Sequence, residues 1–138
     1  MSATPPPHCP LPLPLPLDHG QRLTLRCLRR MAAHGIRDAQ AALWMFEGFG
    51  LQFRRPLVLL RAFVIELAQV SQRRIQLAPC CAMRMTSDEG RIIAILTDPA
   101  TGPEHLPSLT GGAEASSPLS LAVAFSECLP AIELAVEL

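Results

Sequence analysis

The sequence of 138 residues contains no lysine, asparagine or tyrosine, and its twelve basic residues are all arginine. Without lysine the chain has no Walker-type phosphate loop, Schiff base or lysine nucleophile. Without asparagine it has no glycosylation sequon, and without tyrosine it lacks one type of general acid or base. The motifs Gly-x-Ser-x-Gly, His-Glu-x-x-His and Asp-x-Asp are also absent. These absences favour a protein that is not an enzyme.

Long apolar runs and a disulfide framework are missing as well. The most apolar segment, 57–70, contains Arg61 and Glu66, and the N-terminal leucines alternate with proline. Neither segment predicts a membrane span or a signal peptide. The five cysteines are an odd number without framework spacing, which is typical of free thiols. We therefore expect a cytoplasmic protein without a membrane partner.

Charge is balanced over the whole chain but not along it. All arginines lie between Arg22 and Arg91, so residues 1–91 carry a balance of +6 and residues 92–138 a balance of −6. We expect the acidic part to fold against the basic part. Attraction of an anionic partner by the basic part is the alternative.

Hydrophobic spacing, caps and breakers predict an all-α fold. The expected elements are helices at about 20–34, 38–49, 56–73, 86–97 and 118–128, an irregular segment at 75–85 and a mobile loop near 98–117. The helix at 56–73 is apolar over about half of its circumference, which is typical of a central helix. We expect a single domain, residues 18–138, in which a small bundle of four to five helices surrounds this helix.

Residues 1–17 form a separate Pro/Leu-rich arm. Leucine and proline alternate from Leu11 to Leu17, and proline at every second position holds the backbone extended, near polyproline II. A leucine side chain left in water costs about 1–2 kcal/mol. We therefore expect these leucines to lie in an apolar groove, either of the same domain or of a partner.

The first candidate site is an aromatic cluster near the end of the second predicted helix. Four of the six aromatic side chains gather there, namely Trp44, Phe46, Phe49 and Phe53. Core packing explains such a cluster, and so does a surface for a protein partner or for self-association. A non-enzymatic protein-interaction module, self-association included, is the function that we expect first.

The second candidate site is an arginine face on the first predicted helix. At 100° per residue the helix separates its apolar side chains from the arginines Arg22, Arg26, Arg29 and Arg30. The guanidinium fork suits phosphate, so this face predicts a nucleic-acid or anion binder. A solvated face partly neutralised by the acidic C-terminal part is the alternative, and a chain without net charge argues against nucleic acid.

The third candidate site combines two thiols and two thioethers within six residues, Cys80, Cys81, Met83 and Met85. These soft ligands suit Cu(I), and Arg84 together with the following helix start would favour the thiolate of a redox site. Adjacent cysteines point in different directions unless the backbone turns sharply, and buried cysteine and methionine are common core residues. We therefore predict no cofactor and keep metal binding and redox chemistry as alternatives.

Three segments, together with the arm, resemble an uncharacterised family of short bacterial proteins of unknown function. They are Arg29–Gly35, the stretch Phe53–Ala62 with its motif Arg-Arg-Pro-Leu-Val-Leu-Leu-Arg-Ala, and Ala78-Pro79-Cys80-Cys81. The resemblance covers most of residues 10–97 and implies a free-standing bacterial protein. It implies no activity, cofactor or catalytic residue.

Overall fold

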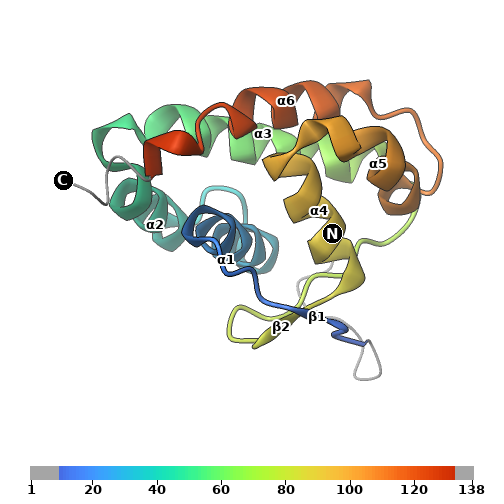
Figure 1. Ribbon diagram of the computed structural model, residues 1–138, viewed down its shortest axis with the longest axis horizontal. Coiled ribbons are helices and arrows are strands. Elements are labelled where there is room, and N and C mark those ends of the chain that lie inside the picture. The colour runs from blue at the N-terminus through green and yellow to red at the C-terminus, as the bar shows by residue number, and fades with distance from the viewer. Residues whose placement is uncertain (1–9, 133–138) are drawn as a thin grey trace.

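The computed structural model describes residues 10–132, and its regular structure is almost entirely helical (Figure 1). The α-helices are α1 (His19–His34), α2 (Ala39–Phe49), α3 (Arg54–Val70), α4 (Ser87–Thr97), α5 (Gly102–Thr110) and α6 (Ser116–Ser126). The described chain also has the 3-10 helices η1 (Gly50–Gln52) and η2 (Pro99–Thr101) and the short strands β1 (Leu13–Pro14) and β2 (Arg84–Met85). The predicted all-α class is confirmed, with more helices than the four to five expected.

The ends of the first two helices follow their capping residues. Asp18 and Asp38 each accept a hydrogen bond of 3.0 Å from the backbone N–H three residues further on, and so begin α1 and α2. Gly35 and Gly50 end these helices at φ 103° and 67°, where a side chain would be strained. Both helices agree with their predicted ranges within one residue.

A capping box formed by Thr86 and Glu89 begins α4. The Glu89 backbone N donates to Thr86 Oγ1 at 3.0 Å, and the Thr86 backbone N donates to Glu89 Oε1 at 2.9 Å. The Thr86 hydroxyl also donates to the carbonyl oxygen of Gln76 at 2.7 Å. The cap therefore fixes the segment that precedes α4 as well as the helix itself.

Residues 98–117, expected to be a loop, instead contain η2 and α5. The many glycines and prolines there suggested irregular structure, but Pro103 lies in the first turn of α5, where no N–H is needed. Leu106 and Leu109 are buried in the core, and Gly111 ends the helix in the left-handed conformation. Apolar packing thus stabilises a helix that the local composition does not favour.

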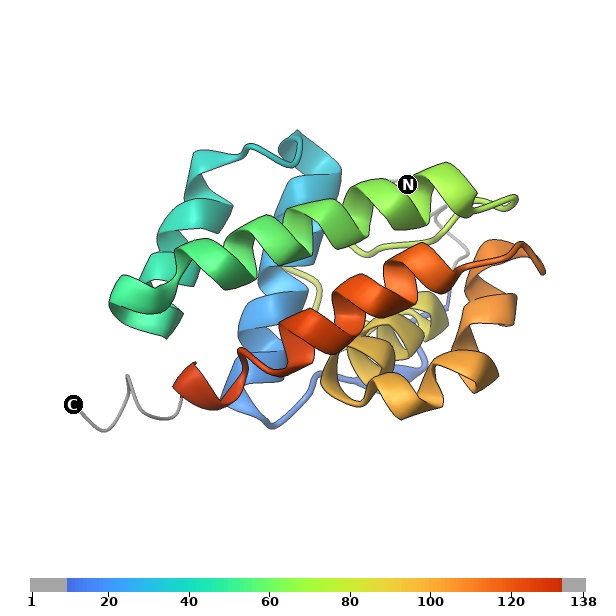
Figure 2. The ribbon, with the colours of Figure 1, turned by 90° about the horizontal axis from the view of Figure 1, so that it is seen from above.

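The helices enclose one hydrophobic core. α3 and α6 run antiparallel and side by side, with α1 and α2 towards one end of the molecule and α4, η2 and α5 towards the other (Figures 1 and 2). The largest fully buried side chains include Leu25, Leu28, Leu60, Phe63, Leu67, Ile92, Ile95 and Phe125. No helix of the described part is both long and apolar enough to cross a bilayer.

The central position is shared by two helices rather than held by α3 alone. α3 ends at Val70, three residues before the predicted end, and packs mainly against α2, η1 and α6, while Val58 on its surface is 60% exposed. α4 contacts α1, α5, α6 and β2. The apolar spacing in the sequence measures the width of a buried face, but it does not tell how many elements cover that face.

The described part of the arm, residues 10–17, packs on the helical domain of the same chain. β1 pairs antiparallel with β2, and Leu13 and Leu15 are half-buried against the core. Leu13 lies on Gly90 of α4, where an added Cβ would overlap its side chain. The Arg84 guanidinium donates to two arm carbonyls at 2.9 and 2.7 Å. Leu17, at the end of the arm, remains 95% exposed.

Candidate interaction surface

Arg29, one of the four arginines expected on the surface of α1, is buried. It is 2% exposed and donates to Glu89 through Nε at 2.7 Å and Nη2 at 3.0 Å. Nη1 also donates to the carbonyl oxygen of Ala82 at 2.9 Å, and Nη2 to that of Arg84 at 2.8 Å. Its donors are engaged within the chain, so Arg29 fixes the segment before α4 to α1 and is not part of an open face.

The other three predicted arginines of α1 each have a separate partner. They are Arg30 with the Asp38 carboxylate at 2.8 Å, Arg22 with the Pro16 carbonyl at 2.7 Å, and Arg26 with the Trp44 ring at 4.1 Å from its centroid. These contacts connect α1 to α2 and to the arm. The four side chains are therefore not brought together around one phosphate-sized position.

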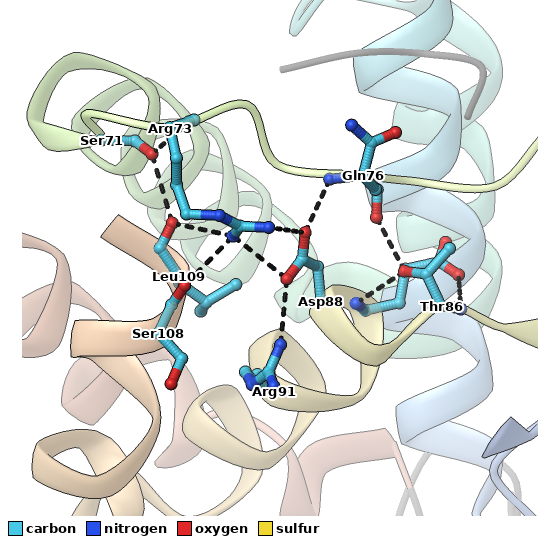
Figure 3. A network of polar contacts seen from close by, with 9 residues as sticks. Ser71, Arg73, Gln76, Thr86, Asp88, Arg91, Ser108 and Leu109 are labelled. Atoms are coloured by element: carbon cyan, nitrogen blue, oxygen red, sulfur yellow. Dashed lines mark hydrogen bonds and ion pairs between the residues drawn. The ribbon is translucent and has the colours of Figure 1, made fainter. Parts of the chain in front are cut away.

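Asp88, at the start of α4, is the centre of a second polar network (Figure 3). Its carboxylate accepts from both Nη atoms of Arg73 at 3.1 and 3.0 Å, from Arg91 at 3.1 Å and from the Gln76 backbone N at 2.8 Å. Arg73 also donates to two carbonyls in the last turn of α5, at 3.1 and 3.2 Å. The network ties the segment after α3 to both α4 and α5.

The two carboxylates at the start of α4 are saturated with donors. Asp88 is 3% and Glu89 0% exposed, and each carboxylate oxygen accepts two hydrogen bonds. Carboxylates are favoured at a helix N-terminus, and full pairing is what buried charges require. These groups therefore serve the fold and leave no lone pair directed at a substrate.

The four sulfur-containing residues of the third candidate site are divided between the surface and the core. Cys80 and Cys81 are the exposed central residues of a turn that a backbone hydrogen bond of 3.0 Å closes. Met83 is 78% exposed, whereas Met85 is 7% exposed and packs in the core from β2. Among residues 10–132 no group of three or more His, Cys, Asp or Glu is placed to hold a metal ion.

The two other cysteines of the described chain are shielded thiols. Burial raises the pKa of Cys27 to about 12, and the nearby Cys80 adds a smaller increase. Burial also raises the pKa of Cys128, although the Arg55 guanidinium beside it acts in the opposite direction. Both side chains therefore remain protonated at neutral pH, and a protonated thiol is a poor nucleophile.

The aromatic cluster is divided between the core and the surface. Phe49 is 3% exposed, Trp44 and Phe53 are half-buried, and Phe46 is 43% exposed. The rings of Phe46 and Phe53 meet edge to face, with centroids 5.3 Å apart and an interplanar angle of 88°. This contact holds an exposed ring in one orientation. Core packing thus accounts for Phe49, whereas Phe46 lies largely on the surface.

Further exposed apolar side chains lie close to Phe46 along the chain. Leu43 lies three residues before Phe46 on α2 and is 48% exposed, and Leu51 in the adjoining η1 is 89% exposed. We name Leu43, Phe46, Leu51 and Phe53 the α2–η1 patch. Leu43 is missing from the predicted cluster, although its spacing of three residues from Phe46 is visible in the sequence.

A groove between the arm and α4–α5 is the second apolar surface. It encloses about 930 Å³, and its walls include Leu13, Leu15, Leu17, Ile93, Ala94 and His105. Since the arm forms one of these walls, the shape of the groove depends on the pairing of β1 with β2. The groove surface is largely apolar, although polar side chains such as Arg91, Asp98 and His105 also line it.

Comparison with known proteins identifies a family but no activity. A family model described as "Family of unknown function (DUF6628)" matches residues 6–136. The expected resemblance to an uncharacterised family is thereby confirmed, and the match extends beyond residues 10–97 on both sides. Neither a curated protein nor a solved structure matches the chain.

Proposed function

Because the chain belongs to the DUF6628 family, whose function is unknown, we propose a function from its surface: a non-enzymatic protein-interaction module that associates with a second copy of itself through the α2–η1 patch. The proposal depends chiefly on the exposure of Leu43, Phe46 and Leu51, at 48%, 43% and 89%. Single exposed apolar side chains are common on monomers, whereas neighbouring ones are typical of protein contacts.

The charges at the border of the patch fit a pair of identical chains. Glu47 follows Phe46 on α2, and Arg54 follows Phe53 at the start of α3; both are exposed and form no ion pair with another described residue. In a two-fold symmetric interface residue i meets residue j of the other copy, and j meets i. Glu47 can therefore face the partner's Arg54, and this contact occurs twice.

The packing of the patch lowers the cost of association. The edge-to-face contact with Phe53 already restricts Phe46, so less side-chain freedom is lost when a partner covers the ring. On the neighbouring α3, Val58 and Ile65 are 60% and 38% exposed. These side chains would add to the apolar area needed for a stable dimer, which buries about 800 Å² per partner.

Sedimentation velocity of the full chain over a range of concentrations tests the proposal. We expect a monomer–dimer equilibrium, which Leu51→Ser and Phe46→Ser shift at least about tenfold towards the monomer, as expected from loss of central contacts. Leu17→Ser is the matched control, since Leu17 is 95% exposed but lies outside the patch. A wild-type chain that remains monomeric at high concentration contradicts the proposal, as does an equal effect of Leu17→Ser.

A charge exchange tests the symmetry of the proposed dimer. Glu47→Arg or Arg54→Glu alone places like charges opposite each other twice, and we expect about tenfold weaker association at low salt. The double variant Glu47→Arg/Arg54→Glu restores opposite charges and should regain most of the wild-type association. Additive losses in the double variant would show that these residues do not face each other.

The same proposal places the module in the cytoplasm. The cysteines of the described chain are all unpaired, and free thiols persist in a reducing compartment. We do not extend the proposal to nucleic acid, because the arginines of α1 already have partners within the chain. We therefore expect RNA and DNA to migrate unchanged in the presence of the protein in an electrophoretic mobility assay at low salt.

A further inference from the structure

The turn that precedes β2 presents two adjacent thiols to solvent. Cys80 and Cys81 are its central residues, and the Ala82 backbone N donates to the Pro79 carbonyl at 3.0 Å to close it. Adjacent side chains of an extended strand point to opposite faces, but a four-residue turn reverses the chain, and in this turn both central residues are exposed. The sharp turn that two neighbouring cysteines require in order to bind one ion together is therefore present.

The base of this turn is fixed by the buried ion pair of α1 and α4. Arg29 donates to the carbonyl oxygens of Ala82 and Arg84 at 2.9 and 2.8 Å. On the other side of the turn, the Ala78 backbone N donates to Glu89 at 3.2 Å. The residues on both sides of the two thiols are thus tied to the core, and a fixed base reduces the entropy lost when both thiols bind one ion.

The donor set determines the kind of ion that fits. It consists of two thiols and, two residues beyond Cys81, the thioether of Met83, which is 78% exposed. Protein-bound zinc takes four ligands, and within residues 10–132 no third His, Cys, Asp or Glu joins the pair. Thiolate and thioether sulfur select Cu(I) over harder ions. The buried Met85 is not part of this set.

We propose that Cys80 and Cys81 bind one Cu(I) ion as a pair of thiolates, with the Met83 thioether as a weaker third ligand. Each thiol releases its proton to water as its sulfur bonds to the metal. Copper remains Cu(I), and the two thiolates and the ion together carry a charge of −1. The site uses no residue of the α2–η1 patch, so its existence does not depend on self-association.

Anaerobic titration of the reduced full chain with Cu(I), in competition with the chromophoric chelator bicinchoninate, tests the site. We expect one tightly bound Cu(I) per chain with sulfur-to-copper absorption in the ultraviolet. Loss of an outer-shell partner weakens metal binding roughly 10–100-fold. We expect Cys80→Ser and Cys81→Ser each to weaken Cu(I) binding by more than this, and Met83→Leu by less. Far-UV circular dichroism verifies that each variant is folded.

Two further variants separate a paired site from independent thiols. Cys128→Ser removes a half-buried thiol and should bind Cu(I) like the wild type. Cys81→Ser combined with Ser87→Cys keeps five cysteines but moves one exposed sulfur onto α4, and should bind no better than Cys81→Ser alone. Binding by this double variant at wild-type affinity, or unchanged affinity in Cys80→Ser and Cys81→Ser, would overturn the proposal.

Discussion

The two ends of the molecule are stabilised by opposite kinds of contact. At the start of α4, Asp88 and Glu89 are almost fully buried and accept hydrogen bonds from arginines and from backbone N–H groups. At the α2–η1 end, aromatic and aliphatic contacts predominate, and several of these side chains remain exposed. The buried charged network thus belongs to the first end, and the exposed apolar patch belongs to the second.

The comparison shows which residues are available for a partner. A buried charge must be paired, and removal of one member leaves the other unsatisfied. The carboxylates of α4 and the arginines around them are therefore committed to the fold, although charged clusters often attract a functional interpretation. An apolar side chain needs no charged partner, so the α2–η1 end can keep apolar side chains exposed in addition to those that its own packing buries.

The largest expected effect is that of Glu89→Gln at the polar end. The variant leaves Arg29 buried without a counter-charge, and breaking a buried pair in this way costs about 3–5 kcal/mol. Urea unfolding followed by circular dichroism measures the free energy of unfolding. Asp98→Asn is the matched control, because Asp98 is exposed and forms no ion pair with another described residue; its expected change is below about 0.5 kcal/mol. Equal effects of the two variants would contradict the comparison.

A smaller loss is expected when the α4 cap is removed. Thr86→Ala eliminates the hydrogen bonds of Oγ1 with the Glu89 backbone N and with the Gln76 carbonyl, and loss of such a cap costs about 1–2 kcal/mol. Thr86→Ser keeps the hydroxyl and should recover most of the loss in the same unfolding experiment. A serine variant as unstable as the alanine variant would indicate that the buried methyl group, and not the cap, is responsible.

The local elements were predictable where a single residue decides the conformation. Asp18 and Asp38 begin helices, Gly35 and Gly50 end them, and the Thr86–Glu89 spacing gives a capping box. α5 was not predictable, because its stability comes from the burial of Leu106 and Leu109 in the core rather than from local preference. The same limit applies to the relative roles of α3 and α4 in the core.

The candidate site was predictable only in part. The aromatic cluster pointed to the α2–η1 end of the molecule, but composition could not tell that Phe49 is buried while Phe46 is exposed. The helical wheel placed Arg29 on the wet side of α1, since a wheel contains no information about Glu89, sixty residues further along the chain. Long-range pairing of this kind depends on tertiary structure, and hydrophobic periodicity does not encode it.

At the α2 end, one polar contact gives a modest dependence on pH. The hydrogen bond from the Arg30 guanidinium holds the pKa of Asp38 below its ordinary value of 3.8, and the Ala41 backbone N contributes in the same direction. The stabilisation is therefore present at neutral pH and is lost as the pH falls through and below that ordinary value. Asp38→Asn keeps the cap but removes the charge, and should lower stability by less than about 1 kcal/mol at pH 6. Thermal unfolding between pH 6 and 2.5 should show this difference shrinking in acid, and a difference independent of pH would contradict the assignment.

The smallest effect is expected for Arg26→Gln, which removes the cation–π contact with Trp44. The guanidinium carbon lies 4.1 Å from the ring centroid at a partly exposed position, where such contacts are worth about 0.5–1 kcal/mol. Trp44 is the single tryptophan, so its emission spectrum reports the change directly. Arg37→Gln, at an exposed arginine between α1 and α2, is a control that should leave the spectrum unaltered. The dimerisation constant should also stay unchanged, because neither residue belongs to the α2–η1 patch. We expect Glu89→Gln to lower the free energy of unfolding several times more than Arg26→Gln does, and only the patch variants to weaken association. This pair of results would separate the end that stabilises the fold from the end that binds. A dimer weakened by Arg26→Gln as strongly as by Leu51→Ser would instead extend the interface onto α1.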